Sequence, residues 1–214
     1  MSAAARAEIV VDLAAIRHNV RLLKELAAPA SMMTVVKADG YGHGLVPAGR
    51  AAREAGAEWL GVATIEEALE LRAAGDDGRV LCWLGVPGED YAAAITADVD
   101  VSAYTVAELA EIRAGCDRAG RPARLQLKVD TGLSRGGAAT EDWPGVVEAA
   151  RRGEESGHWR VTGIWSHFAC SDEPDHPAND AQEKVFLDAL DVAEQSGLRP
   201  EVRHLANSAA AILR

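Results

Sequence analysis

The stretch MTVVKADGYGHG, residues 33–44, joins a short apolar run to a polar, glycine-rich loop. The run Met33–Lys37 contains β-branched residues that favour a buried strand, and it ends in a lysine. A lysine at the end of a buried strand is costly unless its charge is paired or neutralised. A neutral lysine amine is nucleophilic toward an aldehyde, and nearby glycines let the backbone approach an anion. The stretch therefore predicts a site for a ligand that carries an aldehyde and a phosphate.

The same pattern, a short β-branched run followed by a helical stretch, recurs along the chain. Further strands are predicted at Trp59–Ala63, Val80–Leu84, Val99–Ala103, Arg124–Asp130, Val161–His167 and Glu201–Leu205, with an isolated strand at Glu8–Val11. Alanine-rich amphipathic stretches with helical spacing lie between these runs. Strands that alternate with helices indicate a parallel sheet, because a parallel pair of strands needs a crossover connection.

Leaving aside the isolated first strand, the remaining strands are compatible with two architectures. An open doubly wound sheet is one, and a (β/α)8 barrel without its last strand is the other. No G-x-G-x-x-G motif follows the first strands, and polar residues recur at carboxyl ends of strands, where barrel active sites lie. We therefore predict an α/β fold, a parallel (β/α)8 TIM-type barrel truncated after the seventh barrel strand. Residues 1–12 would form an N-terminal strand segment, and residues 13–214 a barrel domain incomplete at its C-terminus.

Several residues mark helix ends. Asp12 is placed to cap the helix that follows it, and Thr64 with Glu67 has the capping-box spacing. Three glycines stand where helices should stop, namely Gly56, Gly75 and Gly197.

Composition excludes some partners. The net charge of −11 argues against a nucleic acid held through its phosphates and against an anionic membrane surface. A bound phosphate would therefore need a local site. Three cysteines without paired spacing, no secretory pattern near the N-terminus and no apolar run of membrane-span length are typical of a cytoplasmic protein.

Polar side chains gather at the carboxyl ends of the predicted strands. Within 125–130, strand alternation places Gln126, Lys128 and Asp130 on one face and apolar residues on the other. A lysine on a barrel face needs a partner, and Arg135 lies just beyond the strand. The last two strands are followed by further polar residues, His167, His204, Asn207 and Ser208. We expect these side chains to share one rim with Lys37.

Four separated segments of the chain resemble motifs of the alanine racemase family, in the family's order. They are VVKADGYGHG, LKVDTGLSRGG, GIWSHFACSDE and HLANSAA. The resemblance spans essentially all 214 residues and implies pyridoxal 5′-phosphate (PLP) as the cofactor. It also implies an isomerase that interconverts L-alanine and D-alanine through a PLP aldimine and two bases. The segment corresponds to the PLP-binding barrel of the family, in which a C-terminal β domain completes the enzyme.

The resemblance assigns roles to individual residues. It implies that Lys37 forms the internal aldimine and acts as one of the two bases. Tyr41 and Ser208 would bind the cofactor phosphate, Ser208 from a helix N-terminus. Arg135 would approach the phenolic oxygen of the cofactor and the substrate carboxylate, for which its planar, permanently charged fork is suited.

The remaining predicted site residues surround the cofactor ring. His167 would lie against the pyridine ring, Asn207 would orient the ring substituents, and His204 would stand behind the residues that touch the cofactor. Lys128 corresponds to a lysine that many family members carry as a carbamate, which orients the arginine. An unmodified Lys128 paired with Asp130 is the competing interpretation. No His/Cys pair with metal-ligand spacing appears, so no metal site is predicted.

The resemblance also sets expectations for assembly. In the family the second base is a tyrosine from the C-terminal domain of a partner subunit, and no residue of this chain matches it. We therefore expect a homodimer in the full-length form and little activity from the 214-residue chain alone. The product D-alanine would be a peptidoglycan precursor. Two alternatives stay open: a racemase or lyase for another amino acid, and a non-catalytic PLP-binding barrel protein.

Overall fold

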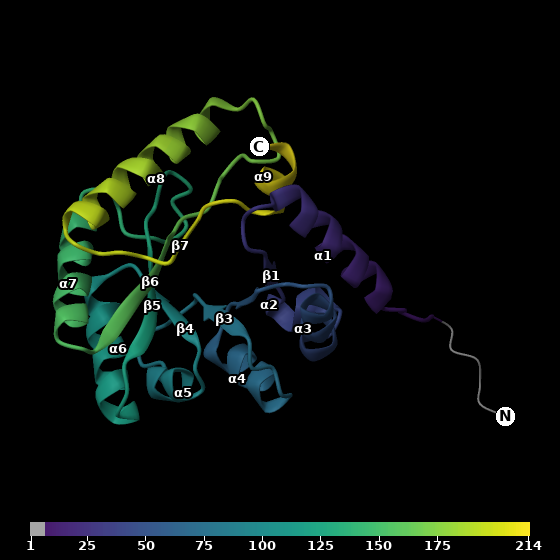
Figure 1. The fold of residues 1–214 in the computed structure, drawn as a ribbon, viewed down its shortest axis with the longest axis horizontal. Helices are drawn as coiled ribbons and strands as arrows, with labels where there is room; N and C mark the ends of the chain where they lie inside the picture. The colour runs from purple at the N-terminus through teal and green to yellow at the C-terminus, as the bar shows by residue number, and fades with distance from the viewer. Residues whose placement is uncertain (1–6) are drawn as a thin grey trace.

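The computed structural model describes residues 7–214, and its strands form one parallel sheet in the order β1-β2-β3-β4-β5-β6-β7. The strands are β1 (Met33–Val35), β2 (Trp59–Val62), β3 (Arg79–Cys82), β4 (Asp100–Ala103), β5 (Ala123–Lys128), β6 (Trp159–Trp165) and β7 (Val202–His204). Each strand pairs with the next along the chain, and β1 and β7 lie at the two edges of a curled sheet (Figure 1). The predicted parallel sheet of barrel type is confirmed, with seven strands among the described residues.

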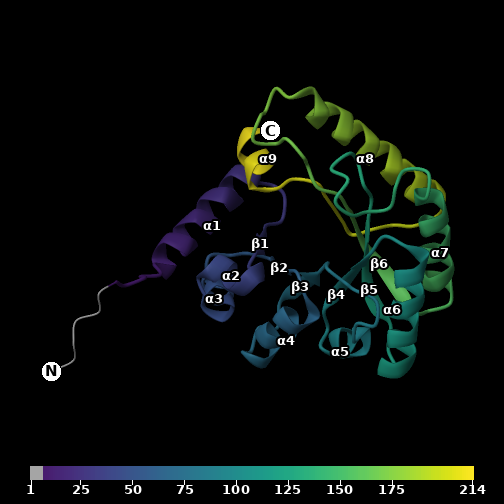
Figure 2. The ribbon, with the colours of Figure 1, turned by 180° about the vertical axis from the view of Figure 1, so that it is seen from behind.

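Helices cover the outside of this sheet. They are α1 (Leu13–Ala27), α3 (Leu45–Glu54), α4 (Ile65–Ala73), α5 (Tyr91–Thr96), α6 (Val106–Ala119), α7 (Trp143–Glu155), α8 (Pro177–Gln195) and α9 (Ser208–Leu213). The label α2 (Lys37–Gly42) marks a short turn after β1 whose backbone is left-handed. Helices α3 to α8 follow one another around the sheet, and α1 and α9 lie side by side near its open edge (Figures 1 and 2). Among residues 7–214, no helix combines the length and apolarity needed to cross a membrane.

The two faces of β5 differ in chemistry, as strand alternation predicts. Leu125, Leu127 and, just past the strand end, Val129 are fully buried in the apolar core that includes residues of the surrounding helices. Gln126, on the opposite face, reaches Asp100 of β4 and His204 of β7 through its side chain. Because β4, β5 and β7 are not all neighbours, these bonds show that this face is the concave interior of the curled sheet.

The predicted helix caps are present. The Asp12 carboxylate accepts hydrogen bonds from the amides of Ala14 and Ala15, at 2.8 and 3.1 Å. The capping box of Thr64 and Glu67 is formed at the start of α4. All three glycines predicted to end helices have positive φ, with values of 96°, 90° and 98° for Gly56, Gly75 and Gly197, which a side chain disfavours.

The strand predicted at Glu8–Val11 is not formed, and this prediction is corrected. No described residue pairs with this segment, and Ile9 and Val10 are 93% and 77% exposed. A strand needs the backbone groups of a neighbour to satisfy its own, and the residues here face no sheet edge of the described chain. The first six residues of the predicted N-terminal segment lie outside the described residues.

Candidate functional site

The predicted site residues lie beyond the carboxyl ends of four strands. Lys37 follows β1, Arg135 lies in the loop after β5, His167 follows β6, and Asn207 and Ser208 follow β7. Because all the strands are parallel, these positions share one end of the sheet. The structure therefore brings together the residues that the sequence places at one rim.

Lys37 opens a left-handed turn rather than ending a strand. Strand β1 stops at Val35, and Ala38, Asp39, Gly40 and Tyr41 have φ values of 53°, 53°, 61° and 56°. A non-glycine residue in this conformation costs roughly 1–2 kcal/mol. Such strain persists where surrounding contacts hold it, and it concentrates at functional sites.

Contacts from its C-terminal side hold this turn. The Asp39 carboxylate accepts a hydrogen bond from the Leu45 amide at 2.7 Å, at the start of α3. The Gly44 amide donates to the Asp39 carbonyl at 2.8 Å. His43 Nδ1 lies 2.9 Å from the Gly40 carbonyl oxygen, so His43 takes part in the architecture of the turn.

Two tryptophans, which the sequence did not single out, line the rim beside the lysines. Lys37 Nζ lies 5.9 Å from the ring centroid of Trp83, and Lys128 Nζ lies 4.7 Å from that of Trp165. The two indole rings meet edge to face at 6.0 Å. A Cβ at Gly61 would stand 2.7 Å from the Trp83 ring, so the small residue in β2 makes room for it. Each indole stands at or just after a strand end, which is the signal that could have identified it.

The loop after β5 folds back over its own strand. Asp130 Oδ1 accepts hydrogen bonds from the amides of Gly132 and Ser134, at 2.9 and 3.1 Å. A Cβ at Gly137 would lie 2.6 Å from the Asp130 nitrogen, so this close approach requires glycine. A Cβ at the neighbouring Gly136 would lie 3.6 Å from Lys128 Nζ. The loop is thereby held directly over Lys128.

The electrostatics of the rim are dominated by unpaired cations. Within residues 7–214, Lys37, Lys128 and Arg135 form no ion pair with any carboxylate, so the predicted alternative of Lys128 paired with Asp130 is not formed. Burial lowers the pKa of Lys128, and the charge of Arg135 lowers it further, against the opposing effect of Asp130. The pKa of His167 is lowered by burial and then by the charges of Arg135, Lys128 and Lys37.

This cation cluster fits an anionic cofactor. In a chain with a net charge of −11, three cations converge on one histidine and repel one another. A bound group with phosphate and phenolate oxygens would neutralise them. The residues present therefore suit PLP, whose aldehyde is within the chemistry of Lys37. Groups of three or more His, Cys, Asp or Glu residues that could hold a metal ion are absent from the described residues.

A polar network continues from the rim into the interior of the sheet. The His204 ring stacks on Trp165 with centroids 5.3 Å apart, and its Nε2 donates to Gln126 Oε1 at 2.9 Å. The Gln126 amide nitrogen faces the buried Asp100 carboxylate at 3.5 Å. Since a carboxylate only accepts, Asp100 orients the amide of Gln126, and the amide in turn sets the tautomer of His204. The role of His204 behind the cofactor contacts stays a prediction.

Stability should fall with acid because of His204. Burial lowers its pKa from the ordinary 6.5 to about 4, so between these values the unfolded chain binds a proton that the folded chain does not. The free energy of unfolding should therefore fall as pH decreases from 6.5 to 4, by about 1–3 kcal/mol from this group. Urea unfolding of the wild type and of His204→Phe at several pH values between 6.5 and 4 measures this fall in stability. The variant should lose less stability than the wild type on acidification. An equal pH dependence in the two proteins would contradict the assignment of this effect to His204. Replacement of the exposed His18 by Gln controls for the loss of a histidine.

Asn207 and Ser208 begin α9, as the sequence predicts. Asn207 Oδ1 accepts from the Ala210 amide at 3.1 Å and from the Ser171 hydroxyl at 2.7 Å. Asn207 therefore caps the helix and ties it to the loop after β6. Ser208 is the first residue of the helix and is exposed, so its hydroxyl and amide are open to a ligand.

Gln182 of α8, a residue that sequence reasoning missed, fixes the segment that carries His167. Its amide nitrogen donates to the His167 carbonyl and to the Thr131 hydroxyl, both at 3.0 Å. Its oxygen accepts from the Ala169 amide at 2.8 Å. One buried side chain thus links the loops after β5 and β6. Its helix-interior position gave no sequence signal for this role.

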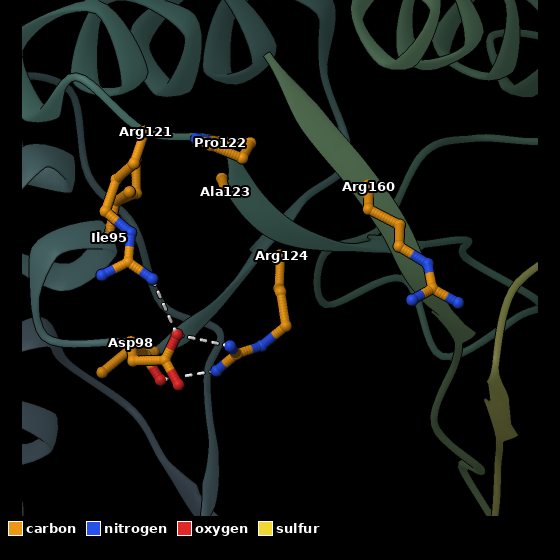
Figure 3. Close-up of a pocket in the computed structure, with 8 residues that line it drawn as sticks. Ile95, Asp98, Arg121, Pro122, Ala123, Arg124 and Arg160 are labelled. Carbon is orange, nitrogen blue, oxygen red and sulfur yellow. Dashed lines mark hydrogen bonds and ion pairs between the residues drawn. The ribbon is translucent and has the colours of Figure 1, made fainter. Parts of the chain in front are cut away.

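A pocket of about 200 Å³ lies at the opposite end of the sheet, where β5 begins. In Figure 3, Arg121 and Arg124 converge on Asp98, while Arg160 points away from it. The ion-pair distances to Asp98 Oδ1 are 3.2 and 2.5 Å, and Arg160 pairs with Glu201 at 2.9 Å. The charged side chains of this pocket are therefore paired within the chain, unlike the cations at the rim.

Comparisons with known proteins agree with this geometry. A protein family described as "Alanine racemase, N-terminal domain" matches residues 11–214. Alanine racemases from Streptomyces coelicolor and Salinispora arenicola are 54% and 52% identical over 97% and 98% of the chain, which covers 54% and 56% of theirs. The crystal structure of alanine racemase from D-cycloserine producing Streptomyces lavendulae superposes with a TM-score of 0.93 at 54% identity, over 94% of this chain and 53% of that one. The chain spans about half the length of these relatives, and it belongs to the alanine racemase N-terminal domain family.

Proposed function

We propose that this chain is the cofactor-binding part of a PLP-dependent alanine racemase, which interconverts L-alanine and D-alanine. The observation that carries the proposal is the cluster of unpaired cations, Lys37, Lys128 and Arg135, around His167 at the carboxyl ends of the strands. The names of relatives with about half of their residues identical support the same reaction.

Each rim residue has a specific task in this proposal. When bound, PLP supplies the electron-withdrawing ring that stabilises negative charge on the substrate Cα. Lys37 holds the cofactor covalently and moves a proton at Cα from one side. Arg135 binds the substrate carboxylate and keeps the phenolic oxygen of the cofactor ionised, because its own charge is permanent.

Other rim residues hold the cofactor in place. Tyr41 and Ser208 bind its phosphate, with the hydroxyl and amide of Ser208 at the start of α9. Asn207, fixed by Ser171 and Ala210, orients the ring substituents, and His167 lies against the ring.

Lys128 is proposed to carry a carbamate. Its lowered pKa favours the neutral amine, whose nitrogen would bond to the carbon of carbon dioxide while one C=O bond opens to a carboxylate oxygen and the N–H proton leaves to solvent. The resulting negative charge would pair with Arg135 and remove the repulsion between the two cations.

The full-length protein is proposed to be a homodimer that takes its second base from a C-terminal domain of the partner. Residues 13–214 would then be its PLP-binding barrel domain and residues 1–12 a separate N-terminal segment. The three cysteines are free thiols, which suits the cytoplasm. The D-alanine formed there would be a peptidoglycan precursor.

The test is made on the full-length protein, since the second base is expected outside residues 1–214. Borohydride treatment should fix PLP to Lys37, located by mass spectrometry, and the protein should racemise alanine in both directions. Residues 1–214 alone should bind PLP with little turnover. A trapped adduct without racemisation of any amino acid would select a non-catalytic PLP-binding protein, and turnover of a different amino acid would replace the substrate. Absence of an adduct at Lys37 would overturn the proposal.

A further inference from the structure

We propose that Glu67 of α4 is a positioning residue for the Lys37 turn, an inference that rests on the proposed role of Lys37. Glu67 Oε1 accepts a hydrogen bond from the Ala38 amide at 2.6 Å, across a separation of 29 residues. Ala38 follows Lys37 directly and is the first of the four left-handed residues. The bond therefore fixes the backbone at the point where the lysine side chain begins.

The same carboxylate also closes the cap of α4. Glu67 Oε2 accepts from the amides of Ala63 and Thr64, at 2.8 and 3.2 Å, while its own amide donates to the Thr64 hydroxyl. The two oxygens thus have separate tasks: one completes the helix N-terminus, and the other holds the turn. Positive partial charge at the N-terminus of α4 favours a carboxylate at this position.

The strained turn is held from both sides by carboxylates. Asp39 anchors its C-terminal side to the Leu45 amide, and Glu67 anchors its N-terminal side. Left-handed backbone geometry is unfavourable for a residue with a Cβ, so Ala38 would relax toward right-handed geometry if it were released. Loss of the Glu67 bond should therefore redirect Lys37.

A second capping box in the chain shows that a helix cap of this kind forms without a bond like the one from the Ala38 amide to Glu67 Oε1. Glu108 Oε2 accepts from the amides of Tyr104 and Thr105, both at 2.9 Å, in the same arrangement as Glu67 Oε2. Among the described residues, Glu108 Oε1 accepts no hydrogen bond. The Ala38 contact is therefore an addition to the cap and points to a distinct task.

Glu67→Gln separates the two tasks. Glutamine serves at this position of a capping box, and its one carbonyl oxygen should face the two amides of Ala63 and Thr64. Its NH2 group then faces the Ala38 N–H, so the bond to the turn is lost while the cap is retained. A hydrogen bond to a charged group is worth about 1.5–3 kcal/mol, which corresponds to roughly tenfold or more in an equilibrium.

Two readouts on the full-length protein test the proposal. Amide hydrogen exchange at Ala38, measured without PLP and resolved by fragmentation of the peptide 33–45, should quicken about tenfold or more in Glu67→Gln. The PLP dissociation constant, from titration of the apo protein, should rise by a similar factor. Two variants serve as controls. Thr64→Ala weakens the α4 cap but leaves the Glu67 carboxylate, so it should change neither the exchange at Ala38 nor the PLP dissociation constant. Glu108→Gln alters the other capping box and should leave exchange at Ala38 unchanged.

The outcomes separate this proposal from the assignment of Lys37. Unchanged exchange at Ala38 in Glu67→Gln, or faster exchange with PLP affinity equal to that of Thr64→Ala, would overturn the positioning role. Either result leaves the wild-type adduct at Lys37 intact. Failure of the wild type to form that adduct would instead overturn the proposed function and would not depend on Glu67.

Discussion

Replacing Lys37 by alanine should abolish the borohydride-trapped PLP adduct and lower alanine racemisation by the full-length protein at least ~10³-fold. The amine is proposed to bind the cofactor covalently and to move the Cα proton, so one substitution removes both. Within residues 7–214, Lys37 forms no ion pair, and its Nζ lies 5.9 Å from the ring centroids of both Tyr41 and Trp83. The loss should therefore appear in chemistry rather than in folding.

A matched control removes an exposed, ion-paired lysine that lies away from the predicted site. Lys184 on α8 is exposed and pairs with Asp188 at 2.7 Å, so Lys184→Ala should keep the adduct and the racemase activity. Circular dichroism and urea unfolding of both variants should resemble the wild type within about 0.5–1 kcal/mol. A Lys37→Ala protein that retains more than a tenth of wild-type turnover would contradict its assignment as a base.

The part of the fold that depends on local pattern was predictable from sequence. The β-branched runs located each barrel strand, although the observed edges differ by one or two residues; β5, for example, covers Ala123–Lys128 instead of Arg124–Asp130. Asp130 left the strand because its carboxylate bonds to two amides of the next loop. Local side-chain hydrogen bonds of this kind compete with the sheet ladder, and the period-two pattern does not report them.

The left-handed turn after β1 could not be predicted from residue preferences. Glycines at positions 40, 42 and 44 indicate a flexible loop, but Ala38, Asp39 and Tyr41 disfavour positive φ. The turn exists because distant groups hold it, Glu67 on one side and Leu45 on the other. Tertiary contacts outweigh local preference here, and only the three-dimensional arrangement shows it.

The interior network beneath the rim was equally hidden. In the sequence, Asp100 is one residue of an apolar strand, and its position along the chain does not predict Arg79, Arg124 or Thr162 as partners. The parallel register places Arg124 directly opposite Asp100 on β5, whereas Arg79 comes from β3 and Thr162 from β6. Register follows from loop lengths and packing across the whole sheet, which a single stretch of sequence does not contain.

Replacing Asp100 by alanine should have the largest effect on stability. Its carboxylate is fully buried and accepts from Arg124 at 2.5 Å, from Arg79 at 2.8 Å and from the Thr162 hydroxyl at 2.9 Å. Removal of one partner from such a network leaves buried charge uncompensated, which costs about 3–5 kcal/mol. Arg124 keeps Asp98, and Arg79 keeps Glu201, so the loss should lie toward the lower end of that range.

Urea unfolding measures this loss against Asp188→Ala, in which an exposed carboxylate loses a single lysine partner and about 0.5 kcal/mol or less. The Asp100→Ala change should also reach the rim, because Gln126 then lacks the carboxylate that orients its amide. A reversed amide would present NH2 to His204 Nε2 and shift the proton to Nδ1, a tautomer change that ¹⁵N NMR of the imidazole detects. Equal stability losses in the two variants would mean that Arg124 and Arg79 are held by Asp98 and Glu201 alone. An unchanged His204 tautomer would mean that the network of Gln126 and His204 beneath Trp165 does not depend on Asp100.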